Sequence, residues 1–474
     1  MVKVGGNMDK SPKDKKKKAL HPMLLLVIVV GICAVLSYLI PAGQYERVLD
    51  EEIGREIIDP DSFTFVERTP ASLLELMMSL TMGMQNAAYV IFFLLIIGGM
   101  FAILNGTGAL NVGIANVLKA LKGHDLFLIP ICMAIFGLGS ALCGNFEEFL
   151  VFVPLMLACC ITMGFDSLTA VGIIFVAAAA GYGGGITNAF TVGIAQQIAG
   201  LPLFSGMGFR VILFAVLELA SMIYVTAYAA AIKKNPKLSG AYAYDQEFNK
   251  GKRLKLEHIP KITVRQILVL LVCLGGIAYA VFGVIHFGYY VDELAGIFLL
   301  VGIIGGAVGG LRPGEICEHF EKGCRDMLLP CLMIGLANAS IVVLQNANVL
   351  DTILHFLAGL LNKLPPTLMG CGMFVFHELF NVIVPSGSAQ ATITMPLMVP
   401  MADRFDMTRQ TAVLAYQLGD AFTNVLAPTG GEILAALAIC KVPFGKWVRY
   451  LLPIFVIWWV IAFAFIIIAA KIGF

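Results

Sequence analysis

The chain has 474 residues, of which 59% are hydrophobic and only 13% are charged. Because soluble domains carry about 25% charged residues, this chain lacks the polar surface of a water-soluble protein. Apolar stretches of about 18 residues or more recur along it, which is the length that a helix needs to cross a hydrocarbon core. The composition therefore predicts an all-α, polytopic integral membrane protein.

Charge and cysteine usage exclude several other classes. The 32 basic and 31 acidic residues nearly cancel, so the net charge of +1 indicates no particular partner and no nucleic acid. The 11 cysteines lie mostly in apolar stretches, without a CxxC pair or a zinc-type Cys/His spacing. We therefore expect no disulfide framework, no structural metal and no cofactor other than a coupling ion.

Five lysines within residues 13–18 precede the first apolar run, residues 24–40. A signal peptide is one interpretation, but the run is long and further spans follow, which favours an uncleaved anchor. The positive-inside rule then places residues 1–20 in the cytoplasm. We expect a multi-pass protein of a prokaryotic cell membrane, with a basic cytoplasmic N-terminus.

The first half, residues 21–232, begins with this anchor, a polar external stretch at 41–70, an interfacial helix at 71–84 and an inward crossing at 87–104. The next stretch, about 126–163, is divided by the sequence CGNFEE at 143–148, which leaves arms of about 17 residues. Two ordinary spans are one reading. The short arms and the repeat described below favour a re-entrant hairpin whose tip stops inside the bilayer.

Residues 168–199 form an apolar run of about 32 residues, which as one helix would be about 48 Å long and exceed the hydrocarbon core. Its centre, GYGGGITN at 181–188, contains three consecutive glycines, and each costs a helix roughly 1 kcal/mol relative to alanine. The run therefore predicts a broken helix, followed by a crossing at 207–232 that returns to the cytoplasm.

A basic cytoplasmic linker, residues 233–262, leads to a second half at 263–474 with a similar layout. In total we predict nine full crossings, with each broken helix counted as one crossing, and two hairpins. The second half is expected to contain crossings at 266–285 and 295–311, an interfacial segment at 312–326, a crossing at 327–344, a hairpin at about 366–401, a broken helix at about 408–440 and a last crossing at 447–470.

The two halves are also related in sequence. Short identical segments recur 242 residues apart: PLM at 154–156 and 396–398, TAV at 169–171 and 411–413, and a threonine at 187 and 429. The predicted crossings give the two units opposite orientations. Inverted repeats with discontinuous helices are the sequence signature of secondary transporters, whose solute site lies where the repeats meet.

The tips of the two predicted hairpins and the breaks in the two predicted broken helices are four interruptions within the membrane. Together they supply the candidate solute and ion site. Unwound backbone and small hydroxyl or amide side chains coordinate Na⁺, and glycines let the backbone approach a ligand, although they also permit close helix packing. Possible Na⁺ ligands are Asn145, Thr187, Ser386 and Thr429. The full set of candidates is Asn145, Glu147, Glu148, Gly184, Gly185, Thr187, Asn188, Ser386, Gly387, Ser388, Gln390, Asp420, Thr429, Gly430 and Glu432.

The four acidic candidates lie at or near the interruptions, which contain no lysine or arginine. A carboxylate inside a membrane is costly and therefore usually functional, the alternative being a protonated carboxyl with a structural hydrogen bond. Such a site suits Na⁺, H⁺ or a cationic amino group. His377 and Glu378 resemble a zinc-protease motif, but Asn381 stands where a second histidine is required, so we interpret them as hairpin structure or a proton relay.

Five motifs, IPAG at 40–43, GNFEE at 144–148, GGGITN at 183–188, PSGS at 385–388 and APTGG at 427–431, resemble the ion transporter superfamily. The chain is similar to its anaerobic C4-dicarboxylate carrier group, which includes YfcC-like proteins and arginine/ornithine antiporters. The resemblance implies a scaffold domain, which is usually dimerised, and a transport domain that moves like an elevator. Glu147 and Glu148 favour an amino acid, a basic one included, over a C4-dicarboxylate.

The main expectation is therefore an ion-coupled transporter or exchanger of a small organic solute. A channel and a membrane enzyme are the competing classes. No P-loop, zinc signature or nucleophile elbow is present in the sequence, which disfavours an enzyme and ATP-driven transport.

Overall fold

The computed structural model describes residues 22–50, 55–120, 125–144, 146–252, 262–287, 289, 291–365 and 368–474. The basic N-terminus and Asn145 lie outside these ranges. Helices dominate the described residues, and strands occur there only as two short pairs, which confirms the predicted all-α class. Seven helices in this part are long and apolar enough to cross a membrane, and six of them are predicted crossings. The seventh is the first arm of the first predicted hairpin.

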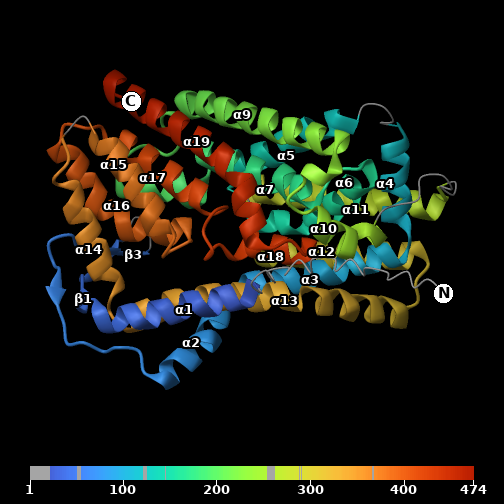
Figure 1. Ribbon diagram of the computed structural model, residues 1–474, viewed down its shortest axis with the longest axis horizontal. Coiled ribbons are helices and arrows are strands. Elements are labelled where there is room, and N and C mark those ends of the chain that lie inside the picture. The colour runs from blue at the N-terminus through green and yellow to red at the C-terminus, as the bar shows by residue number, and fades with distance from the viewer. Residues whose placement is uncertain are drawn as a thin grey trace, which may run out of the picture.

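One group of helices, which we call the scaffold bundle, occupies the lower side and the right-hand end of the protein in the view of Figure 1. Glycines bring its helices together: a methyl group on Gly83 of α2 would lie 2.5 Å from the Gly335 carbonyl oxygen of α13. Between lipid-exposed helices such backbone proximity provides the packing. The bundle contains α1 (Pro22–Leu39), α2 (Leu73–Asn86), α3 (Ala88–Gly106), α4 (Ala109–Ala120), α11 (Val264–Phe287), α12 (Val291–Gly309) and α13 (Pro313–Asn346).

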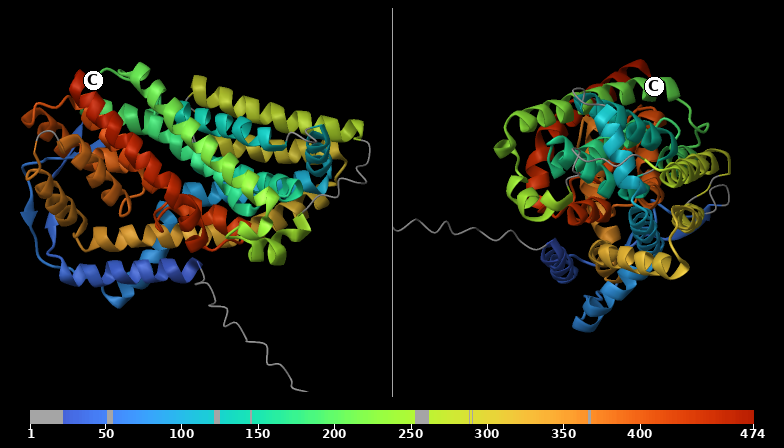
Figure 2. Two further views of the ribbon diagram at one scale, coloured as in Figure 1. Left: turned by 45° about the horizontal axis from the view of Figure 1, so that its top comes forward. Right: turned by 90° about the vertical axis from the view of Figure 1, so that its right-hand side faces the viewer.

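Helix α13 corrects one prediction. The sequence predicted an interfacial segment at 312–326 and a separate crossing from 327, whereas the structure has one continuous helix of 34 residues with Pro330 inside it. Membrane helices tolerate an internal proline when neighbouring groups satisfy the freed backbone. The corresponding part of the first half is divided at Ala87 into α2 and α3. Helix α2 projects from the body of the protein (Figure 2, blue).

The remaining membrane helices form what we call the transport bundle, built around α7 (Ser167–Gly184) and α17 (Arg409–Thr423). Every residue of α7 is buried, because its many alanines and glycines let neighbours pack on all sides. Other members are α5 (Leu128–Cys143), α6 (Val153–Met163), α8 (Ile194–Ile198), α9 (Met207–Lys234), α15 (Met369–Asn381), α16 (Gly387–Arg404), α18 (Gly431–Cys440) and α19 (Phe444–Ile472).

Both predicted broken helices are present, and they run antiparallel. At one end of the bundle the linker residue Asp245 accepts a hydrogen bond from the Ser167 N–H at the start of α7 (3.0 Å), while Asn249 donates to the Cys440 carbonyl at the end of α18 (2.8 Å). At the other end Gln196 of α8 donates to Gln410 of α17 (3.0 Å). We call the first end the linker face. The antiparallel arrangement is what an inverted repeat predicts.

The two hairpins enter from opposite ends and stop halfway. Asp125, just before α5, forms an ion pair with Lys233 near the linker face, and α6 leads directly into α7, so both arms of the first hairpin open there. Its tip reaches only the break of α7, where the Thr187 N–H donates to the Ala141 carbonyl (3.2 Å). Helices α15 and α16 form the second hairpin, and its tip lies against the break between α17 and α18.

The described residues of the polar stretch 41–70 fold more than its composition predicted. Strand β1 (Gly43–Gln44) pairs with β4 (Thr64–Phe65), and β2 (Arg47–Asp50) pairs with β3 (Arg55–Ile58). Strands β1 and β2 contact α14 (Leu350–Leu361), a helix that the sequence analysis missed together with α4. Arg47 forms an ion pair with Asp351 (3.0 Å), and the Phe63 ring stacks on His355 with centroids 3.9 Å apart.

The linker face is held together by buried hydrogen bonds. Asn249, in the short helical segment Asp245–Asn249, donates to both Asp245 (2.8 Å) and the Cys440 carbonyl. Burial raises the pKa of Asp245, and the hydrogen bonds from Ser167 and Asn249 oppose that rise. The linker is therefore attached to the transport bundle rather than loose between the halves.

We predict that Asn249→Ala lowers the stability of the purified protein by about 1–3 kcal/mol, because it leaves buried acceptors unpaired. Losing a donor raises the pKa of folded Asp245 further, so the stability that the proton confers is lost as the pH rises through that pKa. Thermal unfolding at several pH values measures both effects. Gln246→Ala, at an exposed position in the same segment, is the matched control, and equal behaviour of the two variants would refute the attachment.

Candidate functional site

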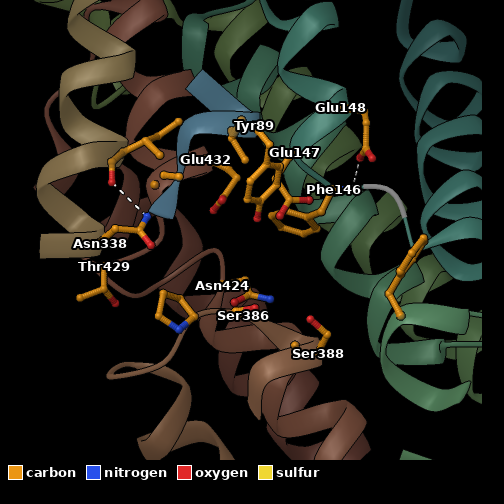
Figure 3. A pocket seen from close by; sticks show the side chains of 18 of the residues that line it. Tyr89, Phe146, Glu147, Glu148, Asn338, Ser386, Ser388, Asn424, Thr429 and Glu432 are labelled. Carbon is orange, nitrogen blue, oxygen red and sulfur yellow. Dashed lines mark hydrogen bonds between the residues drawn. The ribbon is translucent and has the colours of Figure 1, made fainter. Parts of the chain in front are cut away.

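A cavity of about 120 Å³ lies between the scaffold and transport bundles, where the two hairpin tips and the two helix breaks converge (Figure 3). Since each break exposes backbone groups that lipid cannot satisfy, the surrounding protein must be polar at this level. The residues lining the cavity are Ala87, Tyr89, Val90, Gly144, Phe146, Glu147, Glu148, Tyr182, Phe190, Ile334, Asn338, Ile341, Pro385, Ser386, Gly387, Ser388, Asn424, Thr429, Gly431 and Glu432.

Three carboxyl groups line this cavity. Glu147 opens the short 3-10 helix at the first hairpin tip, and Glu432 is in the first turn of α18, where the helix dipole favours a negative charge. Glu148 accepts a hydrogen bond from the Phe146 N–H (3.0 Å) and thereby stabilises the tip. No lysine, arginine or histidine is among the described residues that line the cavity. The site is therefore acidic, without a basic counter-charge on its walls.

The second hairpin tip provides a different chemistry. In the view of Figure 3, Ser386 and Ser388 lie on one side of the cavity, and Glu147 and Glu432 on the other. Helix α16 begins at Gly387, and its N-cap residue Ser386 makes no side-chain capping bond. The first N–H groups of a helix have no intrahelical partner and attract anions. This wall therefore suits a carboxylate.

Gly387 allows the tip to sit directly on α17. A methyl group on Gly387 would lie 2.6 Å from Asp420 Oδ2 and 2.7 Å from the Tyr182 hydroxyl oxygen. The Gly387 carbonyl accepts a hydrogen bond from the Tyr416 hydroxyl of α17 (2.6 Å). Asp420 thus lies behind the hairpin tip instead of lining the cavity.

The motif His377, Glu378 and Asn381 is part of the support of the second hairpin. Gln390 of the other arm donates to the His377 carbonyl (3.1 Å), Asn381 donates to Asp420, and Glu378 accepts from Thr423 and from Trp459 (3.2 Å). Within the described ranges no group of three or more His, Cys, Asp or Glu residues could hold a metal ion. These contacts support the structural reading of the motif.

The two repeat-related threonines connect each break to the hairpin of its own half. The Thr187 hydroxyl donates to the Leu142 carbonyl (2.8 Å), and the Thr429 hydroxyl donates to the Val382 carbonyl (2.6 Å). Their oxygen lone pairs remain available to a cation. Thr429 and Ser386 line the cavity, whereas Thr187 does not, and Asn145 lies outside the described residues.

The structure brings together seven of the predicted site residues at the cavity: Glu147, Glu148, Ser386, Gly387, Ser388, Thr429 and Glu432. The other described candidates surround it. Asn188 caps the helical turn after the first break by accepting from the Phe190 N–H (3.0 Å), and Gly185 ends α7 with φ +49°. Gly184 packs on Phe214, Gly430 precedes α18, and Gln390 supports the hairpin as described above.

Sequence reasoning missed the scaffold wall and several neighbours of the breaks. Asn338 is an amide residue in the middle of the mostly apolar second part of α13, which was the available signal, and its side chain donates to the Ile334 carbonyl (3.1 Å). Asn424 lies one helical turn after Asp420, so helical spacing could have found it. Tyr89, Tyr182, Phe146 and Phe190 also line the cavity, and no sequence pattern separates them from packing aromatics.

We predict that Gly387→Ala lowers the stability of the protein, because the added methyl group would displace the second hairpin tip from Asp420 and Tyr182. Overpacking of this kind costs typically 1–3 kcal/mol, which thermal unfolding should detect. Gly359→Ala in α14 is the control, since no atom lies within 4 Å of the added methyl group. That variant should be neutral or slightly stabilised, because glycine in a helix is less stable than alanine. Equal stability of the two variants would contradict the close approach.

Known proteins resemble this chain in sequence over nearly its whole length. The chain matches the family described as DcuC, C4-dicarboxylate anaerobic carrier, over residues 21–471. It is 30% identical over 475 residues to a protein of Escherichia coli (strain K12) named "Putative basic amino acid antiporter YfcC", covering 92% of this chain and 94% of that protein. An uncharacterized protein of Haemophilus influenzae is 30% identical over 406 residues, covering 85% and 79%.

Two solved transporter structures align with the chain at 16% identity and a TM-score of 0.42, namely Alcanivorax borkumensis YdaH and Neisseria gonorrhoeae MtrF. They cover 96% of this chain, and 99% and 96% of their own chains, respectively. The family match spans nearly the whole sequence, and the named relatives are transporters and not enzymes. This chain is therefore a membrane transporter that belongs to the C4-dicarboxylate anaerobic carrier family.

Proposed function

We propose that the protein is an ion-coupled secondary transporter or exchanger whose favoured substrate is an amino acid with a cationic side chain. The observation that carries the proposal is the cavity with three glutamates and, among its described lining residues, no basic side chain. Charges in a poorly hydrated site are neutralised by protons, bound cations or a cationic substrate. A hydrogen bond between an ammonium or guanidinium group and a carboxylate is among the strongest that a protein makes.

The opposite wall accounts for the carboxylate of such a substrate. The N-terminus of α16 and the hydroxyl groups of Ser386 and Ser388 offer donors to an anion. An amino acid with a second positive charge can therefore place its carboxylate at the second hairpin tip and its cationic end near Glu147 and Glu432. The volume of about 120 Å³ is below the 300–1,000 Å³ of typical drug-sized sites, which supports a small metabolite.

A C4-dicarboxylate is the alternative substrate. The description of the family and the α16 N-terminus favour it. Two further negative charges beside three glutamates would, however, require protonation or bound Na⁺ at the site. The name of the Escherichia coli relative, a putative basic amino acid antiporter, agrees with the cationic substrate.

We also propose that the transport bundle moves along the scaffold. The substrate cavity faces Asn338 of α13, while a second space of about 600 Å³ separates the bundles nearer the linker face, beside Asn105, Asp326 and Lys441. From Asn338 to Asp326 the helix rises about 18 Å at 1.5 Å per residue. A shift of this size would carry the site toward the linker face. By family resemblance we expect a homodimer through the scaffold, in a prokaryotic cell membrane with the N-terminus inside.

Ligand binding tests the substrate. We predict that L-arginine or L-ornithine raises the melting temperature of the purified protein and that Glu147→Gln or Glu432→Gln removes this stabilisation, because each removes a carboxylate of the cationic subsite. Glu75→Gln, on the exposed part of α2, is the control and should bind like the wild type. Stabilisation only by succinate or fumarate would instead establish the dicarboxylate alternative. Saturable counterflow in liposomes distinguishes a carrier from a channel.

Disulfide crosslinking tests the movement. Gly431 of α18 contacts Ile334 of α13, where a methyl group on the glycine would lie 2.9 Å from Ile334 Cγ1. In a cysteine-free background, Gly431→Cys should therefore crosslink to Ile334→Cys. If the bundle translates, Gly431→Cys should also crosslink to Met327→Cys, which lies about two turns nearer the linker face on the same side of α13 and lines the second space. Absence of the second crosslink during active transport would argue against this movement.

A further inference from the structure

A fourth membrane-embedded glutamate lies outside the substrate cavity. Glu218 is in the middle of α9, within a stripe of buried residues that faces α5 and α7. Only 4% of its surface is exposed, and neither carboxyl oxygen has a hydrogen-bond partner among the described residues. A buried polar group without a partner destabilises the fold, and an unpaired buried charge destabilises it more. Packing therefore gives no reason for a glutamate at this position.

Two glycines create the space for this carboxyl group. A methyl group on Gly137 of α5 would lie 2.6 Å from Glu218 Oε2, so the carboxyl rests directly on the α5 backbone. Gly181 of α7 packs against the Gly137 carbonyl at the same level. Ser140, one turn further along α5, is fully buried, and its hydroxyl likewise has no partner in the described structure. The contact leaves no room for a hydrated cation between Glu218 and α5.

The helices that touch Glu218 also form the substrate site. Six residues after Gly137, α5 ends at Cys143, directly before the tip that carries Glu147. Gly181 is followed by Tyr182, which lines the substrate cavity. A change in the position of α5 or α7 at Glu218 would therefore move the walls of that cavity.

The other titratable groups near Glu218 are one tyrosine at a similar height in the bundle and several groups nearer the two ends of α9. Arg210 is on the same buried stripe, two turns away, and its guanidinium also has no partner in the described residues. From α7 the nearest such group is Tyr182. From α19, Tyr450 faces Gly172 of α7, while Tyr224 of α9 donates to the Tyr450 carbonyl. Toward the linker face, Tyr228 of α9 donates to Asp166 (2.7 Å), Asp125 of the preceding 3-10 turn binds Lys233, and Lys237 follows α9.

We propose that Glu218 is the binding site of the coupling proton, separate from the substrate cavity and linked to it through α5 and α7. This inference rests on the proposed transport function and assigns its coupling ion. Glu218 is neutral in the packed arrangement described here. Release of its proton leaves a carboxylate that must be hydrated, so α5 and α9 separate, and α5 carries the first hairpin tip with it. A proton needs no cavity of its own, which fits the close packing on Gly137.

Glu218→Gln tests the proposal, because glutamine keeps the shape of glutamate and cannot release a proton. In liposomes, L-arginine accumulation driven by an imposed pH gradient should fall roughly fivefold or more, the lower range of measured site-to-site coupling. Counterflow of L-arginine without a gradient should remain, because the cavity is unchanged. Glu247→Gln in the exposed linker is the control and should behave like the wild type in both assays.

Infrared spectroscopy gives a readout that does not need transport. At neutral pH the wild type should show a protonated carboxylic acid band that is lost in Glu218→Gln. Its absence in the wild type, or unchanged pH-driven accumulation by the variant, would overturn the proposal. Wild-type accumulation of L-arginine that follows a Na⁺ gradient and ignores a pH gradient would overturn it while leaving the transport function intact. A wild type without any counterflow would overturn the proposed function and the coupling together.

Discussion

The structure depends on one constraint: a helix that breaks inside a membrane must find partners for the backbone groups it exposes. Here the Thr187 N–H of the first break donates to the Ala141 carbonyl of its hairpin. The threonine hydroxyls of both breaks in turn satisfy carbonyls at the hairpin tips, Thr187 that of Leu142 and Thr429 that of Val382. The hairpins in turn need the breaks, because their own tips end in the interior. Each hairpin and broken helix therefore form one polar junction, and the two junctions enclose the cavity between the bundles.

The same constraint explains why polar residues concentrate at one level. The tips and breaks bring helix N-termini, hydroxyls and carboxyl groups into a space that the surrounding apolar helices isolate from lipid. In such surroundings an ionised group must be paired, hydrated or protonated. Glu147 and Glu432 face the cavity, where a solute or ion can reach them, whereas Glu378 and Asp420 are hydrogen-bonded within the second hairpin support. The position of a carboxyl group thus separates the carboxyls that we propose to bind ligand from those that support the hairpin.

The two halves share a plan but not its details. Helices α4 and α14 begin 241 residues apart, and α7 and α17 begin 242 residues apart. The acidic tip belongs only to the first hairpin, and the serine-rich tip only to the second. Because the halves run in opposite directions, the two tips approach the cavity from opposite ends. Divergence between the repeats therefore produces a site with two chemically different walls, which a symmetric pair of tips could not form.

The amino-acid sequence determined the membrane class, the hairpins, the two breaks and the polar residues at them. These features follow from local rules, namely the length of apolar runs, the cost of consecutive glycines and the spacing of the repeats. Contacts between distant segments could not be deduced in this way. The sequence did not show that Asn338 of the scaffold completes the cavity, that α13 continues through Pro330, or that the linker binds α7 and α18.

Tertiary structure also decided which acidic residues face the cavity. Asp420 and Glu432 were equal candidates in the sequence, since both lie near the second break. Gly387 places a hairpin tip over Asp420, while the first turn of α18 directs Glu432 to the open space. Glu218 could not be linked to the first hairpin before Gly137 was known to pack against it. The chemical type of each residue is local information, but its partner depends on how helices from both halves pack together.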